Sequence, residues 1–151
     1  MPTPPYRIFF DTSVYIAALL SPEGAAGELI RLAESGVIQM VVSQRVIIES
    51  DQVLKNKFSN LIEDSRRLWK SLSPELIKEP TSLKSKFFIE ILPLSDALIL
   101  SAAHKAGVLA FVTWNTRDFM KKGVESLVMF PIVVPGDCLK LFRGWIIPFW
   151  D

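Results

Sequence analysis

Short apolar runs that alternate with segments of helical spacing are the strongest constraint on the fold of this chain. The runs at Arg7–Phe10, Val37–Val42 and Val108–Thr113 have the length and the β-branched or aromatic content of buried strands. Pro131–Val134 is a weaker run of the same kind. Strands that alternate with helices predict an α/β fold with a mainly parallel sheet of about four to five strands, flanked by helices.

The helical segments between these runs carry recognisable start and stop signals. Thr12 or Ser13, Ser43 and Ser95 precede apolar residues at helical spacing, so we expect their side chains to cap helix N-termini. Gly107 is a natural helix stop, because glycine adopts the left-handed conformation that ends many helices. The expected helices cover residues 14–20, 25–35, 44–57, 60–72, 96–105 and 137–142.

Three segments fit this alternation less clearly. Within residues 73–92 we expect a short strand at 77–79, whereas "KFFIEIL" (86–92) suits either a strand or a helix. The first five residues are proline-rich and are expected to form a flexible tail. The aromatic tail 144–151 is too apolar to float freely, so we expect it either to pack on the core or to form an interface. The 151 residues are most simply one domain.

Composition excludes several classes of protein and favours none. Basic and acidic residues nearly balance at 17 and 16, so the net charge gives no argument for or against a nucleic-acid partner. A single cysteine, Cys138, and a single histidine, His104, rule out a disulfide within the chain and a Cys/His zinc site. No apolar segment reaches the length of a membrane helix. We therefore expect a cytoplasmic protein without a membrane partner.

Four acidic residues occupy places where a parallel sheet builds its sites. Asp11 and Asp118 follow predicted strands, while Glu49 and Asp96 lie on helices that could lean over the same edge. Carboxylates gathered in one crevice repel one another, and a divalent cation such as Mg²⁺ or Mn²⁺ removes that repulsion. Such a cation also supports phosphodiester hydrolysis. Spacing alone leaves the alternative open, because acids at strand and helix ends also serve as caps and as solvated loop residues.

An ordered set of four motifs resembles the PIN-domain ribonucleases, a family that includes the VapC-type toxins of toxin–antitoxin pairs. The motifs are "FFDTSVYIAALL", "SQRVIIESDQVL", "LPLSDALILSAAHKAG" and "LAFVTWNTRDF", and together they extend over most of Arg7–Phe119. The resemblance implies a three-layer fold, an acidic pocket for Mg²⁺ or Mn²⁺, and metal-dependent cleavage of RNA. It also implies an antitoxin protein as a partner and a homodimer.

The resemblance assigns roles to particular residues. It implies an acidic catalytic set formed by Asp11, Glu49, Asp96 and Asp118, with Asp11, Asp96 and Asp118 as our choice for the metal ligands. Side chains expected to orient these carboxylates are Thr12, Ser13, Thr113 and Asn115. Many relatives have an acid where Asn115 stands, which leaves the number of bound metal ions open. Possible RNA contacts close to the last motif are Arg117, Lys121 and Lys122.

Three alternative functions are open at this level. A haloacid-dehalogenase-type phosphatase also begins with a strand and an aspartate, but its motif needs a second aspartate where Ser13 stands. A housekeeping nuclease of RNA processing would carry the same acids as a toxin. A non-catalytic PIN-like module for binding RNA or protein is disfavoured because all four acids are present.

Overall fold

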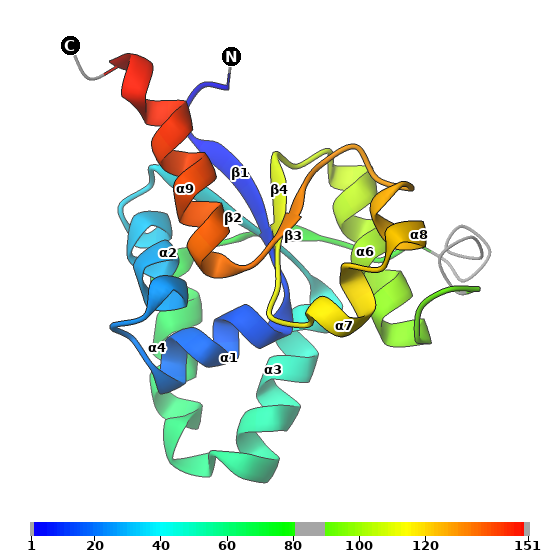
Figure 1. The fold of residues 1–151 in the computed structure, drawn as a ribbon. Coiled ribbons are helices and arrows are strands. Elements are labelled where there is room, and N and C mark those ends of the chain that lie inside the picture. Colours follow the sequence, from blue (N-terminus) through cyan, green and yellow to red (C-terminus); the bar gives the residue numbers. More distant parts are fainter. Residues whose placement is uncertain (1, 81–89, 150–151) are drawn as a thin grey trace.

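The computed structural model describes residues 2–80 and 90–149, and its centre is one parallel sheet (Figure 1). The five strands lie in the order β3-β2-β1-β4-β5, and every neighbouring pair is parallel. They span Tyr6–Phe10 (β1), Ile38–Ser43 (β2), Glu75–Ile77 (β3), Ala110–Val112 (β4) and Ile132–Val133 (β5). The predicted α/β fold with a mainly parallel sheet is confirmed.

Helices cover both faces of this sheet and make the fold three-layered. In Figure 1 the helices α2 and α9 stand on one side of the strands and α6 on the other. The helices are α1 (Thr12–Leu20), α2 (Ala25–Glu34), α3 (Gln44–Lys57), α4 (Ile62–Leu72), α6 (Leu94–Ala106), α7 (Thr116–Phe119), α8 (Lys122–Glu125) and α9 (Pro135–Ile146), with short 3₁₀ turns η1 (Ser59–Leu61) and η2 (Ile147–Phe149). Within the described ranges, none of the helices is both long and apolar enough to span a membrane.

The position of β1 at the centre of the sheet explains why its sequence is so apolar. Ile8 pairs with Met40 of β2 on one side and with Ala110 of β4 on the other. Ile8, Phe9 and Phe10 are fully buried. A strand with neighbours on both edges and helices on both faces has no solvent-facing side, so it reads as a continuous hydrophobic run rather than an alternating one.

Aromatic stacking fixes the elements that carry the acidic residues. Phe9 of β1 stacks on Phe111 of β4 with ring centroids 5.3 Å apart, and Phe111 contacts Phe119 of α7 at 4.9 Å. Tyr15 of α1 stacks on Trp69 of α4 at 4.0 Å. Because these rings lie within a few residues of Asp11, Thr113 and Asp118 in the chain, core packing also determines where those side chains emerge.

Of the predicted helix caps, only Ser43 occupies the expected N-cap position, and its side chain makes no capping bond. The helices α1 and α6 begin at Thr12 and Leu94, so Ser13 and Ser95 already lie within the first turn. Ser43 does stand before α3, but the backbone N–H of Arg45, which its hydroxyl would bind, donates to the Glu79 carboxylate at 2.5 Å. A longer-range carboxylate thus replaces the local hydroxyl at α3, and the hydroxyls at α1 and α6 are available for other bonds.

Several predicted strand limits shift by a few residues. The strand expected at Val108–Thr113 is shorter, Ala110–Val112, and the one expected at 77–79 is Glu75–Ile77. The strand β3 is set by its pairing with β2, which sequence patterns do not reveal. Of the segment "KFFIEIL", only 90–92 lie within the described residues, where they form a turn and a bend rather than a strand or helix.

The C-terminal region is more ordered than the predicted tail. The last helix was expected at 137–142 but extends over Pro135–Ile146, and η2 follows it to Phe149. Trp145 stacks on Tyr6 with ring centroids 5.3 Å apart, so the first part of the aromatic tail packs on the core. Ile147 and Phe149 remain exposed at 62% and 58%.

Candidate active site

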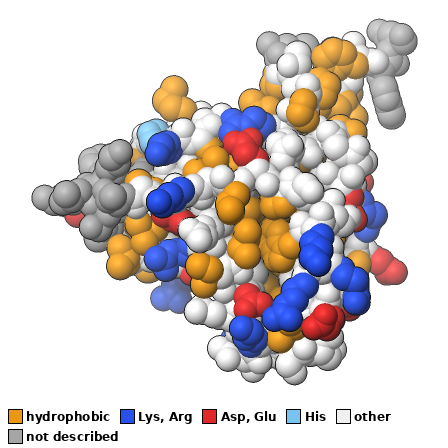
Figure 2. All heavy atoms as spheres, turned by 180° about the vertical axis from the view of Figure 1, so that it is seen from behind, with side chains coloured by type: hydrophobic (Ala, Val, Ile, Leu, Met, Phe, Trp, Pro, Cys, Tyr) orange, Lys and Arg blue, Asp and Glu red, His pale blue; other side chains and the backbone are white. Residues whose placement is uncertain are grey.

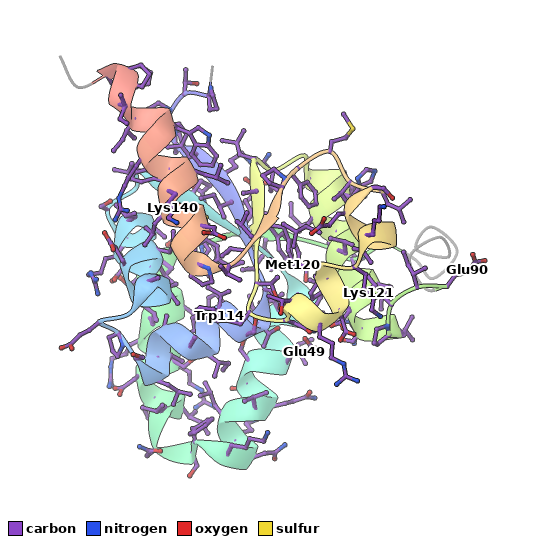
Figure 3. All side chains as sticks on the ribbon, in the orientation of Figure 1. Glu49, Glu90, Trp114, Met120, Lys121 and Lys140 are labelled. Atoms are coloured by element: carbon purple, nitrogen blue, oxygen red, sulfur yellow. The ribbon has the colours of Figure 1, made fainter. Side chains whose placement is uncertain are left out.

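The four acidic residues lie at the carboxyl edge of the sheet. Asp11 directly follows β1, Asp118 lies in α7 just after β4, Asp96 is in the first turn of α6, and Glu49 is on α3. Figure 1 shows the end of β1 close to the beginnings of α1 and α3 and to α7, and Figure 3 shows Glu49 below α7. The charges of Asp11, Asp118 and Glu49 all act on Asp96, so the four carboxyl groups share one region.

Asp11 is the most buried of these acids, with 5% of its surface exposed. Its Oδ2 atom accepts hydrogen bonds from Thr113 Oγ1 at 2.7 Å and from Ser13 Oγ at 3.0 Å. Burial raises the pKa of Asp11, the two hydroxyl bonds act in the opposite direction, and the nearby Glu49 charge raises it further. The carboxylate is therefore held in one orientation in a poorly solvated place.

The two hydroxyls that bind Asp11 are themselves oriented by the backbone. The backbone N–H of Asn115 donates to Thr113 Oγ1 at 2.9 Å, and that of Trp114 donates to Ser13 Oγ at 2.9 Å. A hydroxyl oxygen that accepts a backbone N–H directs its own proton elsewhere, here toward Asp11. The structure thus places both hydroxyls on Asp11, and their role in a reaction stays a prediction.

Glu49 is held by hydroxyls from two other helices. Thr12 Oγ1 of α1 donates to Glu49 Oε1 at 3.1 Å, and Ser95 Oγ of α6 donates to Glu49 Oε2. Thr12, one of the residues expected to orient the four carboxylates, thus contacts Glu49 through its side chain and Asp11 through its backbone. Ser95 was expected to be a helix cap and was missed as a site residue. Its position directly before Asp96 is the sequence signal that could have suggested a place in the site.

Asp118 is paired with residues of its own turn. Asn115 Nδ2 donates to Asp118 Oδ2 at 3.2 Å, and the Asp118 backbone N–H donates to Asn115 Oδ1 at 3.3 Å. Asn115 thus caps α7 and orients the carboxylate at the same time. Lys121 Nζ lies 3.6 Å from Asp118 Oδ1, so this predicted RNA contact is a counter-ion of an acidic residue. Arg117 and Lys122 are exposed nearby.

The neighbouring carboxylates also act on Asp96, which is half-buried. Burial raises its pKa to about 6, and the charges of Asp11, Asp118 and Glu49 contribute in that order, while Lys121 acts against them. Perturbed carboxyl groups clustered in this way are typical of functional sites.

A hard divalent cation would suit this set of donors. Carboxylate oxygens are the ligands that Mg²⁺ and Mn²⁺ prefer, and a cation would relieve the repulsion that raises the pKa of Asp96. In residues 2–80 and 90–149, however, no three Asp, Glu, His or Cys side chains form a ready-made metal-binding cluster. Shared coordination of one cation would require these carboxylates to reorient.

The other reactive side chains do not join the acidic region. Burial raises the pKa of Cys138 to about 12, which makes its thiol a poor nucleophile. His104 is exposed toward the C-terminal end of α6, whereas Asp96 is in its first turn. The chemistry available at this edge is therefore that of carboxylates.

Solved structures share this fold. Structures of VapBC from Salmonella typhimurium and VapBC2 from Rickettsia felis, both bound to DNA, superpose with TM-scores of 0.62 and 0.59. The matches cover 86% and 84% of this chain and 98% and 96% of those chains, at 18% and 16% identity. PAE2754 from Pyrobaculum aerophilum matches with a TM-score of 0.59 and 17% identity, covering 91% of this chain and 96% of its own.

Sequence comparisons identify the family. A comparison with curated proteins found no match. The family model described as the PIN domain matches residues 7–117, most of the chain. This range contains Asp11, Glu49 and Asp96 and ends one residue before Asp118. The resemblance inferred from the four motifs is confirmed at this level: the chain belongs to the PIN domain family.

Proposed function

We propose that this protein is a Mg²⁺- or Mn²⁺-dependent endoribonuclease that hydrolyses RNA phosphodiester bonds as the VapC-type toxin of a toxin–antitoxin pair. The observation that carries this proposal is the crowding of carboxylates around Asp96, whose pKa rises to about 6. A site that gathers negative charge without an equal number of cations suits a metal ion and a phosphodiester substrate.

In this proposal, Asp11, Asp96 and Asp118 hold the cation and Glu49 completes the acidic pocket. A bound cation would supply Lewis acidity for activating water and for stabilising charge on a phosphoryl oxygen. Thr113 and Ser13 keep Asp11 in a single orientation through their 2.7 Å and 3.0 Å bonds. Asn115 does the same for Asp118 at 3.2 Å. The protein thus holds two of these carboxylates with neighbouring side chains before a cation binds.

In this proposal, Lys121 changes its partner from Asp118 to an RNA phosphate when a cation binds. Its ammonium lies 3.6 Å from Asp118 and is half-exposed. A cation that binds Asp118 would weaken this surface ion pair, which contributes little stability by itself. We propose that Lys121 then contacts an RNA phosphate, together with the exposed Arg117 and Lys122.

We also propose a protein antitoxin as a partner and a homodimer as the assembly. Two of the similar structures are VapBC complexes bound to DNA. Hydrophobic side chains gather near the centre of the face that Figure 2 shows. The helices α3 and α4 and strand β3 also leave apolar residues at a surface pocket, among them Ile47, Trp69 and Leu76. Apolar surface of this kind favours association with another protein chain.

The activity is tested by incubating labelled RNA with the purified protein, with and without Mn²⁺. The variants Asp11→Asn and Asp96→Asn are expected to lose cleavage by at least about a hundredfold, because each removes a charge from the site. Asp137→Asn is the matched control, since Asp137 is a solvent-exposed acid near Lys140 on α9. Cleavage that persists in both site variants would refute the proposed site.

Two further measurements separate the alternatives. A non-catalytic module would show no heat of Mn²⁺ binding in calorimetry, whereas the nuclease is expected to bind the ion. A housekeeping enzyme would not arrest growth when expressed, whereas a toxin is expected to do so until the product of a neighbouring gene is co-expressed.

A further inference from the structure

A surface pocket lined mostly by residues with polar side chains opens directly beside the acidic region. It has a volume of about 390 Å³ and is lined by Thr12, Glu49, Gln52, Val53, Asn56 and Lys57. Apart from Thr12, these residues are positions 49, 52, 53, 56 and 57 of α3, which are related by steps of three or four residues and therefore share one face of the helix. The pocket is therefore a stripe along α3 that starts at a carboxylate of the candidate active site.

Two residues connect the pocket to that site. Glu49 and Thr12 line the pocket, and they also bind each other through the 3.1 Å bond that helps to fix the Glu49 carboxylate. From Glu49 to Lys57 the helix rises by about 12 Å, so the ammonium lies well beyond the acidic cluster. A strand whose phosphate is held at the carboxylates could continue along this stripe.

The chemistry of the pocket suits a nucleotide. Gln52 and Asn56 are exposed and lie one helical turn apart, and each amide offers both donors and an acceptor for the edge of a base. Val53 is half-buried between them and provides a small apolar floor. A pocket of this size and mixed character is in the range that holds small-molecule groups.

Lys57 differs from its neighbours in its charge environment. Lys55, two residues earlier, is paired with Asp51 at 2.9 Å on another side of the same helix. Arg66 and Arg67 of α4 are paired with Glu63 and Asp64. Lys57 is exposed and takes part in no ion pair among the described residues. It is thus a cation available for a phosphate group.

We propose that this stripe is a substrate subsite, in which Gln52 and Asn56 bind the base next to the scissile phosphate and Lys57 binds the following phosphate of single-stranded RNA. The proposal rests on the proposed nuclease function and adds where the strand runs and which residues select the base. A protein segment is the less suitable occupant, because a protein anchor needs a deeper apolar pocket than Val53 supplies.

The test compares Lys57→Ala with Lys55→Ala, two equal changes of charge on the same helix. Cleavage kinetics of short single-stranded RNAs are measured with Mn²⁺ at several salt concentrations. Lys57→Ala is expected to raise KM on the order of fivefold for every sequence, with kcat retained, and to lower the salt slope by about 0.7. Lys55→Ala is expected to match the wild type, because its ammonium points to Asp51.

Base selection is tested separately with Gln52→Ala and Asn56→Ala. The substrates are RNAs that differ only in the base beside the cut. Where the wild type cleaves one of them faster than another, each variant is expected to reduce that ratio of rates by about tenfold. Circular dichroism and unfolding curves check that all the variants fold, which is expected since the three side chains are exposed.

Failure of this subsite differs from failure of the nuclease function. A wild type that cleaves RNA, together with Lys57→Ala kinetics equal to those of Lys55→Ala, would refute the subsite alone. Variants that lose affinity for a co-purified protein partner while keeping wild-type RNA kinetics would also refute it. A wild type that cleaves no RNA under any of these conditions would instead refute the proposed function on which the subsite rests.

Discussion

The two ends of strand β1 carry charges that are handled in opposite ways. At the beginning of the strand, Arg7 donates from Nε and Nη2 to the Glu75 carboxylate at 3.0 Å and 2.6 Å, and from Nη1 to the Ala106 carbonyl at 2.8 Å. The bond to Arg7 lowers the pKa of Glu75. This end of the sheet joins β1, β3 and the last turn of α6 through a charge that is fully paired.

At the other end of β1, four carboxylates gather. The ammonium of Lys121 pairs with Asp118 and acts on Asp96. Burial raises the pKa of Asp11, and burial together with neighbouring charges raises that of Asp96. The electrostatics of the two ends thus distinguish a structural ion pair from a candidate functional cluster. At the first end, pairing with Arg7 stabilises the ionised form of Glu75. At the second end, burial and neighbouring carboxylates disfavour the ionised form of Asp96 until a cation binds.

Binding of Mn²⁺ should give the largest contrast between the two ends. At a concentration a hundred times its Kd, the ion is expected to add about 2.7 kcal/mol to the free energy of unfolding, since it binds the folded site. Thermal melts with and without Mn²⁺ measure this shift. It should vanish in Asp11→Asn and persist in Glu75→Gln; equal shifts in both variants would place the ion elsewhere.

Removal of the Thr113 hydroxyl should affect activity next most strongly. Thr113→Val keeps the shape of a fully buried side chain but removes the 2.7 Å bond to Asp11. Loss of a group that orients a metal ligand commonly costs about 10- to 100-fold in activity or metal affinity. Cleavage rates and Mn²⁺ calorimetry check this, and Thr113→Ser should restore most of both. If the serine variant is as impaired as the valine variant, the hydroxyl is not the cause.

The pH dependence of stability should have opposite signs at the two ends. Folded Asp96 has a pKa of about 6, above its ordinary value of 3.8. As pH rises, the folded state therefore loses this proton at a higher pH than the unfolded state does. Stability should therefore fall as pH rises from about 4 to about 6, by about 1 kcal/mol once the partial exposure of Asp96 is allowed for.

Urea unfolding at a series of pH values measures this slope. Asp96→Asn is expected to flatten it, because the asparagine does not titrate. Glu75 acts in the reverse direction: its lowered pKa gives stability that is present above about pH 4.5 and lost as pH falls. An unchanged profile in Asp96→Asn would show that the crowding at the carboxyl edge has no energetic consequence.

The smallest effect is expected from the paired end. Glu75→Gln removes a charge whose side chain is about one-third exposed, at 36%, so the loss of stability at neutral pH should be at most about 1 kcal/mol. RNA cleavage should remain at the wild-type rate, because Arg7 and Glu75 lie at the other end of β1. A large fall in cleavage with little change in stability would contradict the separation of the two ends.

Local patterns were sufficient to predict the strand that precedes Asp11 and the α/β alternation. The run before Asp11 is continuously apolar because β1 is buried on both faces. Gly107 ends α6 as expected, in the left-handed conformation with φ +66°. The PIN family also followed from motif order, since each motif is tied to a strand or helix end. The roles of the four acids, by contrast, stay predictions until the variants are measured.

Only the tertiary structure decided which side chain meets which. Thr12 and Ser95 both bind Glu49, from positions 37 and 46 residues away in the chain, and neither bond follows from a local pattern. The same holds for Glu79, which replaces Ser43 as the cap of α3, and for Trp145, which stacks on Tyr6. The physical reason is that periodicity fixes the faces of single helices and strands, while hydrogen-bond partners depend on how separate segments pack.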